Sequence, residues 1–229
     1  MPNSALIVGA GSGLSASLAR RFTADGMRVA VAARDSGKLA PLCSETGAVA
    51  FACDATQPDQ VTKLFEDAIA ALGPLDVVVF NPSARASGPT AELDPAAVLR
   101  ALTISAFGGF LVGQAAARHM LPRRSGAILF TGASASVKGY PQSAAFAMGK
   151  FALRGLAQSM ARELSPQGIH IAHFVIDGGI RSATRVDPAD RPDSLLDPDA
   201  IAETYLHVVK QHRSAWTWEV ELRPWVERF

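Results

Sequence analysis

The sequence predicts an α/β protein built on a single doubly wound parallel sheet of about seven strands, with helices on both faces. Six or seven short apolar runs alternate with helical patterns along the entire chain. Most of these runs are continuously apolar, as expected of parallel strands that are buried on both faces. A glycine-rich turn at 9–13 separates the first apolar run from the first helical pattern. Right-handed crossovers would then bring a ligand crevice to the carboxyl ends of the strands, beside this turn.

The first half of the chain fits four strands separated by three helices. Leu14, Leu18 and Phe22 recur every four residues and predict the first helix. Pro58 suits the first turn of a helix that Gly73 ends. The expected strands are 5–8, 27–33, 48–53 and 75–80, and the expected helices are 14–22, about 36–46 and 58–72.

The second half continues the alternation after a loop at 81–89 that is rich in Pro, Ser and Gly. Asp94 and Pro95 fit the N-cap and first position of a long helix. The polar, proline-bearing segment 181–199 is expected to be a loop or a lid. The expected helices are 95 to about 119, about 142–164 and about 199–212, and the expected strands are 126–131, 169–176 and 216–222.

The composition favours a single domain that spans residues 1–229. The chain is 48% hydrophobic and 19% charged, with a net charge of +1, so neither a nucleic-acid surface nor a polybasic membrane patch is expected. No signal peptide and no apolar span of about 20 residues is apparent. Cys43 and Cys53 lack metal-ligand spacing, which predicts free thiols in a reducing compartment. We therefore expect a cytoplasmic protein with no bound metal and no membrane partner.

The glycine turn has the context of a dinucleotide-binding turn. Glycines let the backbone bend tightly and approach a pyrophosphate, and the following helix offers that anion unpaired N–H groups and its positive dipole end. Ser15 stands where the G-x-G-x-x-G pattern has its third glycine. The alternative is a strand–helix turn without a ligand. The predicted cofactor contacts are Gly9, Gly11, Ser12, Gly13 and Leu14.

The tips of the next two strands carry polar side chains. In dinucleotide folds an acidic residue after the second strand accepts ribose hydroxyls, whereas an arginine suits a 2′-phosphate. Arg34 precedes Asp35 at this tip, which favours NADP over NAD; the alternative is a solvated arginine with Asp35 as a helix cap. Asp54 follows the third strand, and it either accepts from an adenine amino group or caps the next helix.

Several of these features together resemble the short-chain dehydrogenase/reductase family, over essentially the whole chain. They are the glycine turn, the tips at 53–56 and 81–84, and an early lysine, Lys150, in the helix after the fifth strand. The resemblance implies a Rossmann-type fold of seven parallel strands, NAD(P) binding, and dimers or tetramers built on the two long helices. It also implies that Asn81 supports the sheet and cofactor and that Lys150 holds the nicotinamide ribose.

The catalytic positions that the resemblance implies are altered. The family has a Tyr four residues before the Lys, on the same helix face, where the ammonium lowers the phenol pKa for proton transfer. Phe146 occupies that position and has no ionisable proton. The family serine position falls on Ala133, and neighbouring Ser134 is expected to take its role unless it only forms a turn. The asparagine that holds a relay water is replaced by Ser105.

The loops around the expected site supply further candidates. The family's Pro-Gly beside the nicotinamide reads Asp177-Gly178 here, and Ser182 keeps a hydroxyl where the family often has Thr near the carboxamide. Tyr140, before the second long helix, is the candidate surrogate acid, with a role at the pocket rim as the alternative. Ser143 is too weak an acid without an activating base.

Residues 214–229 are expected to form an oligomerisation tail. Trp216, Trp218, Trp225 and the terminal Phe229 would make a large apolar patch on a monomer. Together with the small residues of the long helices, they favour a homodimer or homotetramer, and packing on the chain's own sheet edge is the alternative. His170 and His173 lie in a predicted buried strand and are expected in the core or in an interface.

The segment 181–199 contains Arg181, Arg185 and Arg191, which suggests that an anionic group is tolerated there.

Two functions fit these residues. The first is an NADP(H)-binding oxidoreductase that acts on a small carbonyl, alcohol or C=C substrate with a non-standard proton donor. The second is an NADP(H)-binding protein with impaired catalysis, acting as a sensor or oligomer partner. The fold does not decide between them, because function resides in the site. The sequence does not identify the substrate.

Overall fold

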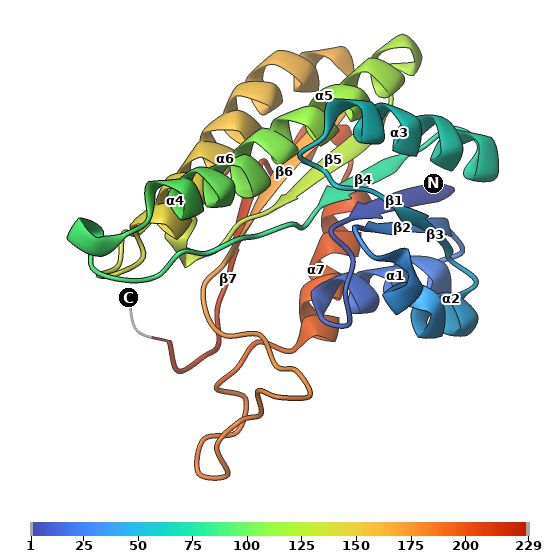
Figure 1. The fold of residues 1–229 in the computed structure, drawn as a ribbon. Coiled ribbons are helices and arrows are strands. Elements are labelled where there is room, and N and C mark those ends of the chain that lie inside the picture. The colour runs from blue at the N-terminus through green and yellow to red at the C-terminus, as the bar shows by residue number, and fades with distance from the viewer. Residues whose placement is uncertain (1, 228–229) are drawn as a thin grey trace.

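The computed structural model describes residues 2–227, which form one seven-stranded parallel sheet between two layers of helices (Figure 1). The strand order is β3-β2-β1-β4-β5-β6-β7, and the predicted fold class is confirmed. The strands are β1 (Ser4–Val8), β2 (Arg28–Ala33), β3 (Val49–Ala52), β4 (Val77–Phe80), β5 (Gly126–Thr131), β6 (Ile169–Ile176) and β7 (Glu219–Leu222). The helices are α1 (Leu14–Ala24), α2 (Ala40–Thr46), α3 (Pro58–Leu72), α4 (Pro95–Leu102), α5 (Gly108–Met120), α6 (Ala144–Leu164) and α7 (Pro198–Val209).

The sheet divides its apolar side chains between two cores. In β1, Leu6 and Val8 face the core formed with α3, α5 and α6, whereas Ala5 and Ile7 face the core formed with α1, α2 and α7. Figure 1 shows these two groups of helices on opposite sides of the sheet. Both faces are covered, and this explains why the central strands are apolar throughout rather than alternating.

The strand order reverses at β1, which pairs with β2 on one side and with β4 on the other. In sheets of this kind a crevice opens at the reversal, outside the carboxyl ends of the strands. Phe80, the last residue of β4, pairs with Val8 of β1 and with Phe130 of β5. The loops after these three strands therefore begin at the same level and converge on one region.

A π-helical turn interrupts the long helix predicted from residue 95. Thr103–Phe107 joins α4 to α5 without a break in the helical path, and single π turns of this kind are frequent at functional sites. Ser105 lies in this turn and is fully buried. A Cβ on Gly149 of α6 would lie only 2.9 Å from the Cβ of Ser105. The π turn therefore packs tightly on α6, next to Lys150.

The whole helical stretch Pro95–Arg123 is long and apolar enough to cross a membrane by length and composition alone, with a hydropathy of 1.7. The expectation that no such span exists is therefore wrong on those two criteria. The inner side of the stretch packs against β4, β5 and α6. Gly109 faces Phe80 and Gly113 faces Phe130, so close that added Cβ atoms would lie 3.3 and 3.1 Å from the rings. Only 33% of its most apolar part is buried, so core packing accounts for only part of the apolar composition.

Two further elements differ from the prediction. The helix expected over 36–46 begins as a 3₁₀ helix, Ser36–Leu39, before α2. The last strand begins at Glu219 rather than at Trp216. The side chain of Gln211 bonds both the N–H and the hydroxyl of Thr217, at 2.8 and 2.9 Å. These bonds hold the chain in a turn, so pairing with β6 starts later.

Candidate functional site

The turn after β1 allows close approach of a ligand. Gly9 has a φ of +82°, and a Cβ there would lie 2.7 Å from Pro82, so a larger residue would be strained. The Gly9 N–H donates to the carbonyl of Ala32 at 2.9 Å. Cβ atoms on Gly11 and Gly13 would meet nothing within 4 Å. Gly11 therefore borders the open space that a phosphate cradle requires, whereas Gly13 is the N-cap of α1.

Ser15, which replaces the third glycine of the pattern, ties the turn to the tip of β4. Its hydroxyl donates to the Gly9 carbonyl at 3.2 Å and accepts from the Asn81 amide at 2.6 Å. The Asn81 N–H donates to the carbonyl of Val8 at 2.9 Å. Ser15 thus links the glycine turn to the tip of β4 through hydrogen bonds. The motif could not reveal this role, because Asn81 lies 66 residues away in the sequence.

A cavity of about 1070 Å³ opens beside this turn, at the carboxyl ends of β1 to β4. Its volume is at the upper end for small-molecule sites. Gly13 caps α1 and Leu14 is buried in the core, so neither lines the cavity. The predicted residues that line it are Gly9, Gly11, Ser12, Arg34, Asp54 and Asn81. Lining residues that sequence reasoning missed include Lys38, Leu99, Arg100, Thr103 and Ile104.

Arg34 and Lys38 bring two exposed cations to one end of this cavity. Lys38 pairs with Asp35 at 3.3 Å, and Asp35 also accepts from the Gly37 N–H at 3.2 Å. Asp35 therefore acts as a cap, which was one of the two interpretations. Among the described residues Arg34 has no acidic partner, and a free guanidinium is suited to bidentate binding of a phosphate.

Asp54 organises the turn after β3. Its Oδ1 accepts from the N–H and the hydroxyl of Thr56, at 3.0 and 2.8 Å. The N-cap of α3 is Gln57, so Asp54 holds a tight turn rather than capping the helix. Its carboxylate faces the same cavity, and its contact with an adenine remains a prediction.

Lys150 lies on α6 and is almost completely buried, at 2% exposure. Its Nζ donates to the carbonyl of Thr131, the last residue of β5, at 2.7 Å. Burial, and secondarily the charge of Arg85, lower the pKa of Lys150 to about 7. A group with such a pKa exchanges its proton at neutral pH, as a general acid or base must.

Phe146 lies one helical turn before Lys150, and its ring is 8% exposed. The guanidinium carbon of Arg85 lies 4.1 Å from the centroid of this ring, within the range of a cation–π interaction. Arg85 comes from the loop after β4 and was not predicted to be a site residue. No sequence signal marks it, because its position depends on the path of that loop.

The predicted hydroxyls lie in loops around this centre. Ser134 begins a short 3₁₀ helix and is half-buried. Tyr140 is 45% exposed in the loop before α6. Ser182 is exposed, and its hydroxyl accepts from the Arg185 N–H at 3.1 Å. Gly178 packs against Pro224, which would lie 2.8 Å from an added Cβ. None of these four residues, nor Lys150, lines the 1070 Å³ cavity.

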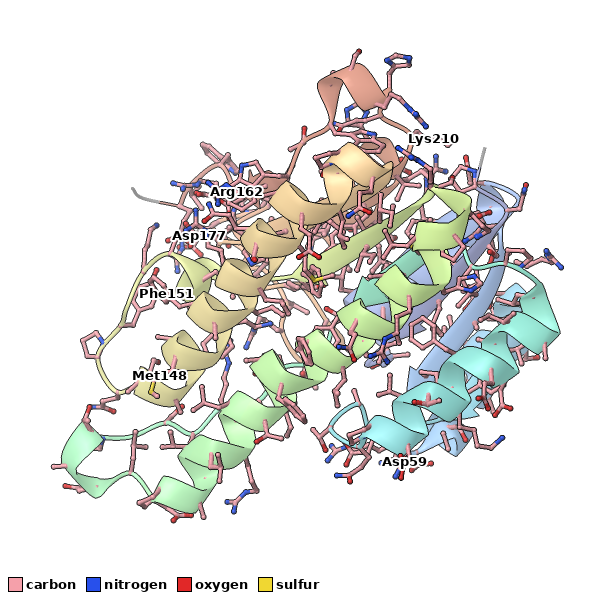
Figure 2. The ribbon with its side chains drawn as sticks, turned by 90° about the horizontal axis from the view of Figure 1, so that it is seen from above. Asp59, Met148, Phe151, Arg162, Asp177 and Lys210 are labelled. Atoms are coloured by element: carbon pink, nitrogen blue, oxygen red, sulfur yellow. The ribbon has the colours of Figure 1, made fainter. Side chains whose placement is uncertain are left out.

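Carboxylates after β6 are engaged by cations within the chain. Asp177 (labelled in Figure 2) is buried and pairs with Lys138 at 2.9 Å and with Arg223 at 3.4 Å. In the lid segment, Arg181 pairs with three aspartates, Asp187 at 2.6 Å, Asp193 at 3.1 Å and Asp197 at 2.9 Å. The charge of Arg181 is therefore already compensated by these aspartates. Arg181 no longer supports the expectation that this segment tolerates an anionic ligand.

His173 belongs to a buried polar network at the edge of the sheet. Its Nδ1 lies 3.1 Å from Glu219 Oε2, and Arg154 binds both oxygens of the same carboxylate at 2.6 and 2.8 Å. Burial lowers the pKa of His173 to about 4, although the Glu219 charge opposes the shift. The histidine is therefore neutral in the folded protein at neutral pH.

The tail packs on its own sheet in part. Trp216 stacks on His170 with ring centroids 4.7 Å apart, and Trp218 lies beside the guanidinium of Arg154 at 5.5 Å. These two tryptophans follow the alternative interpretation, packing on the sheet edge. Trp225 is 79% exposed, and Phe229 lies outside the described residues.

Comparison with known proteins gives consistent matches. The profile of a family described as short chain dehydrogenase matches residues 3–191. A solved short-chain dehydrogenase from Rhodopseudomonas palustris is 38% identical, with a TM-score of 0.85 over 97% of this chain and 99% of its own. A metagenomic short-chain oxidoreductase solved with NADP is 26% identical, with a TM-score of 0.84 over 97% of each chain. Short chain aldehyde dehydrogenase 1 of Euphorbia lathyris is 29% identical over 73% of this chain but only 60% of its own length.

The buried neutral His173 predicts a stability loss in mild acid. The unfolded chain takes up a proton near the ordinary pKa of 6.5, whereas the folded chain takes it up only near 4. Stability is therefore complete above the unfolded value and falls as pH drops through this window, by about 2 kcal/mol between about pH 7.5 and about pH 5. Urea unfolding of the wild type and of His173→Gln measures this difference. The variant is expected to show a flatter pH dependence, while His207→Gln, at an exposed site on α7, is expected to match the wild type. Equal slopes for wild type and His173→Gln would contradict the assignment.

Proposed function

The chain belongs to the short chain dehydrogenase family, and from this premise we propose that it is an NADP(H)-binding oxidoreductase acting on a small carbonyl, alcohol or C=C substrate. The observation that carries this proposal is the cavity beside the glycine turn, which gathers the ends of four parallel strands around open space at Gly11 and two cations. Fold alone would not suffice, since one fold serves many functions.

Different groups of lining residues would bind different portions of NADP. The glycine turn and the N-terminus of α1 would hold the pyrophosphate. Arg34, with Lys38 beside it, would hold the 2′-phosphate, and a related oxidoreductase at 26% identity was solved with NADP. Asp54 and Asn81 would border the adenine and the sheet side of the cofactor. When bound, this cofactor supplies or accepts a hydride.

Proton transfer needs a group other than residue 146. The chain has two tyrosines; Tyr205 is buried in the core formed with α1, α2 and α7, on the opposite side of the sheet from α6, and its hydroxyl is bonded to the Thr131 hydroxyl at 2.9 Å. Tyr140 is exposed in a loop before α6. Lys150 is the stronger candidate, because it lies one turn from Phe146 and its pKa of about 7 matches a donor at neutral pH. Ser134 would then orient the substrate oxygen.

A second candidate function is favoured by Phe146 itself. A phenylalanine with no ionisable proton stands next to the lysine, and a site of this composition can bind the cofactor without turning over a carbonyl. In that case the protein would act as an NADP(H) sensor or as an oligomer partner. Binding is common to both functions, so only turnover separates them.

The outer faces of the long helices support a homodimer or homotetramer. Phe107 and Phe110 are exposed and stacked on each other with ring centroids 6.3 Å apart. Met148 and Phe151 are exposed on α6, where Figure 2 labels them. Four large exposed apolar side chains on two packed helices are unusual on a monomer. We propose that these faces meet in the oligomer.

Replacing Arg34 with alanine is expected to weaken NADPH binding by about 10-fold to 100-fold, because a charge-assisted contact with the 2′-phosphate is lost. NADH binding should change by less than about threefold, since NADH lacks that phosphate. Isothermal titration with both cofactors measures the two effects, with Arg118→Ala, at an exposed site near the end of α5, as the control. An equal loss for NADPH and NADH would overturn the 2′-phosphate assignment.

Replacing Phe146 with tyrosine separates the two functions. If catalysis is impaired for lack of a phenol, carbonyl reduction with NADPH should appear or rise by about 10²-fold or more, the scale of general acid catalysis. The control is His207→Tyr, which adds a phenol to an exposed position of α7. Rates on a panel of aldehydes and ketones provide the measurement. No gain on a carbonyl compound that binds would count against lost catalysis and favour Lys150 as a sufficient donor.

A charge placed on the exposed face of α6 should disrupt the oligomer. In sedimentation experiments Phe151→Glu is expected to shift the protein to monomers, because burying an unpaired carboxylate is costly. Val186→Glu, at an exposed lid position, should leave the assembly unchanged. A wild-type protein that sediments as a monomer would refute the proposed interface.

A further inference from the structure

Two cations, Arg85 and Lys150, flank Phe146, and neither has an acidic partner among the described residues. Arg85 lies over the Phe146 ring at 4.1 Å, and Lys150 lies one helical turn along α6 from that ring. Burial is the main cause of the lowered pKa of Lys150, and the charge of Arg85 contributes to it. Within residues 2–227, Arg85 makes no hydrogen bond and no ion pair, and Lys150 bonds only a backbone carbonyl, that of Thr131. The pair therefore has no counter-charge of its own.

The nearby carboxylates are engaged elsewhere. Asp177 is held between Lys138 and Arg223, and the aspartates of the lid surround Arg181. Arg85 is exposed, whereas Lys150 is buried, and two neighbouring like charges repel each other. An anion bound between them would relieve this repulsion and would be attracted by both groups.

The aromatic ring strengthens this preference. The guanidinium carbon of Arg85 lies 4.1 Å from the centroid of the Phe146 ring, so the ring shields the guanidinium from water on the side of this contact. A planar guanidinium with free edge donors binds a carboxylate through two parallel hydrogen bonds. A phenylalanine at this position also offers no hydroxyl that would compete for those donors.

We propose that Arg85 binds a carboxylate of the substrate, so that the protein acts on oxo acids or hydroxy acids in preference to neutral carbonyl compounds. This inference rests on the proposed function. Arg185 is the competing residue, since its side chain lies near Gly179 in the loop after β6.

Benzoate and benzamide test the proposal without any need for turnover. The two molecules have nearly the same shape and differ in charge. Each is titrated by calorimetry into the full-length protein saturated with NADP⁺. We expect benzoate to bind at least about tenfold more tightly than benzamide. Arg85→Gln should abolish this preference, and Arg85→Lys should retain only part of it, because lysine keeps the charge but not the paired donors.

Two matched variants complete the design. Arg118→Gln removes an exposed arginine near the far end of α5 and should leave the preference intact. Arg185→Gln should do the same. The proposal is overturned if wild-type protein binds both probes equally or neither of them, if the preference survives Arg85→Gln, or if it disappears in Arg185→Gln instead.

The same titrations separate this inference from the proposed function. NADP⁺ binding is measured for each variant before the probes are added. Normal NADP⁺ binding without a benzoate preference would refute the role of Arg85 alone. Absence of NADP⁺ binding to the wild type would refute the proposed function, and the probes would then be titrated into the free protein, where Arg85 already lies against the Phe146 ring.

Discussion

The site depends on one hydrogen bond, from the Lys150 ammonium to the Thr131 carbonyl at 2.7 Å. It ties α6 to the carboxyl end of β5. The Thr131 hydroxyl in turn meets the Tyr205 hydroxyl at 2.9 Å, from α7 on the opposite face of the sheet. One residue at the end of a central strand thus connects both helical layers. The bond also holds a charged group out of water, which is costly unless the charge is compensated, and the lowered pKa of the lysine is the consequence.

The charge balance of the site follows from this constraint. A buried ammonium favours a nearby acid, yet each carboxylate after β6 whose contacts are described above already pairs with another cation. The loop after β4 adds Arg85 instead, and the Phe146 ring provides the surface on which it lies. The phenyl ring of Phe146 carries no proton to donate, and the charged groups beside it, Arg85 and Lys150, are both basic.

Sequence reasoning was most successful where local pattern and topology act together. Apolar runs, helix caps and the glycine turn predicted the sheet, and the rule that loops meet at the carboxyl edge brought Arg34, Asp54 and Asn81 to one cavity. It failed where the partner is distant in sequence. The bridge from Ser15 to Asn81 and the network of His173 with Glu219 span 66 and 46 residues. No local pattern encodes them, and the position of Arg85 likewise depends on the fold of a whole loop.

The burial of Lys150 is difficult to explain by stability alone. An apolar side chain of similar length would fill the same space without the desolvation penalty, and such replacements often stabilise a protein. What the lysine adds is a proton that is half dissociated near neutral pH, because its pKa is about 7. An anion bound beside Arg85 would raise that pKa and keep the ammonium charged, whereas a neutral ligand would leave it partly deprotonated. If Arg85 binds a substrate carboxylate as proposed, substrate charge and proton supply would be coupled through the same two cations.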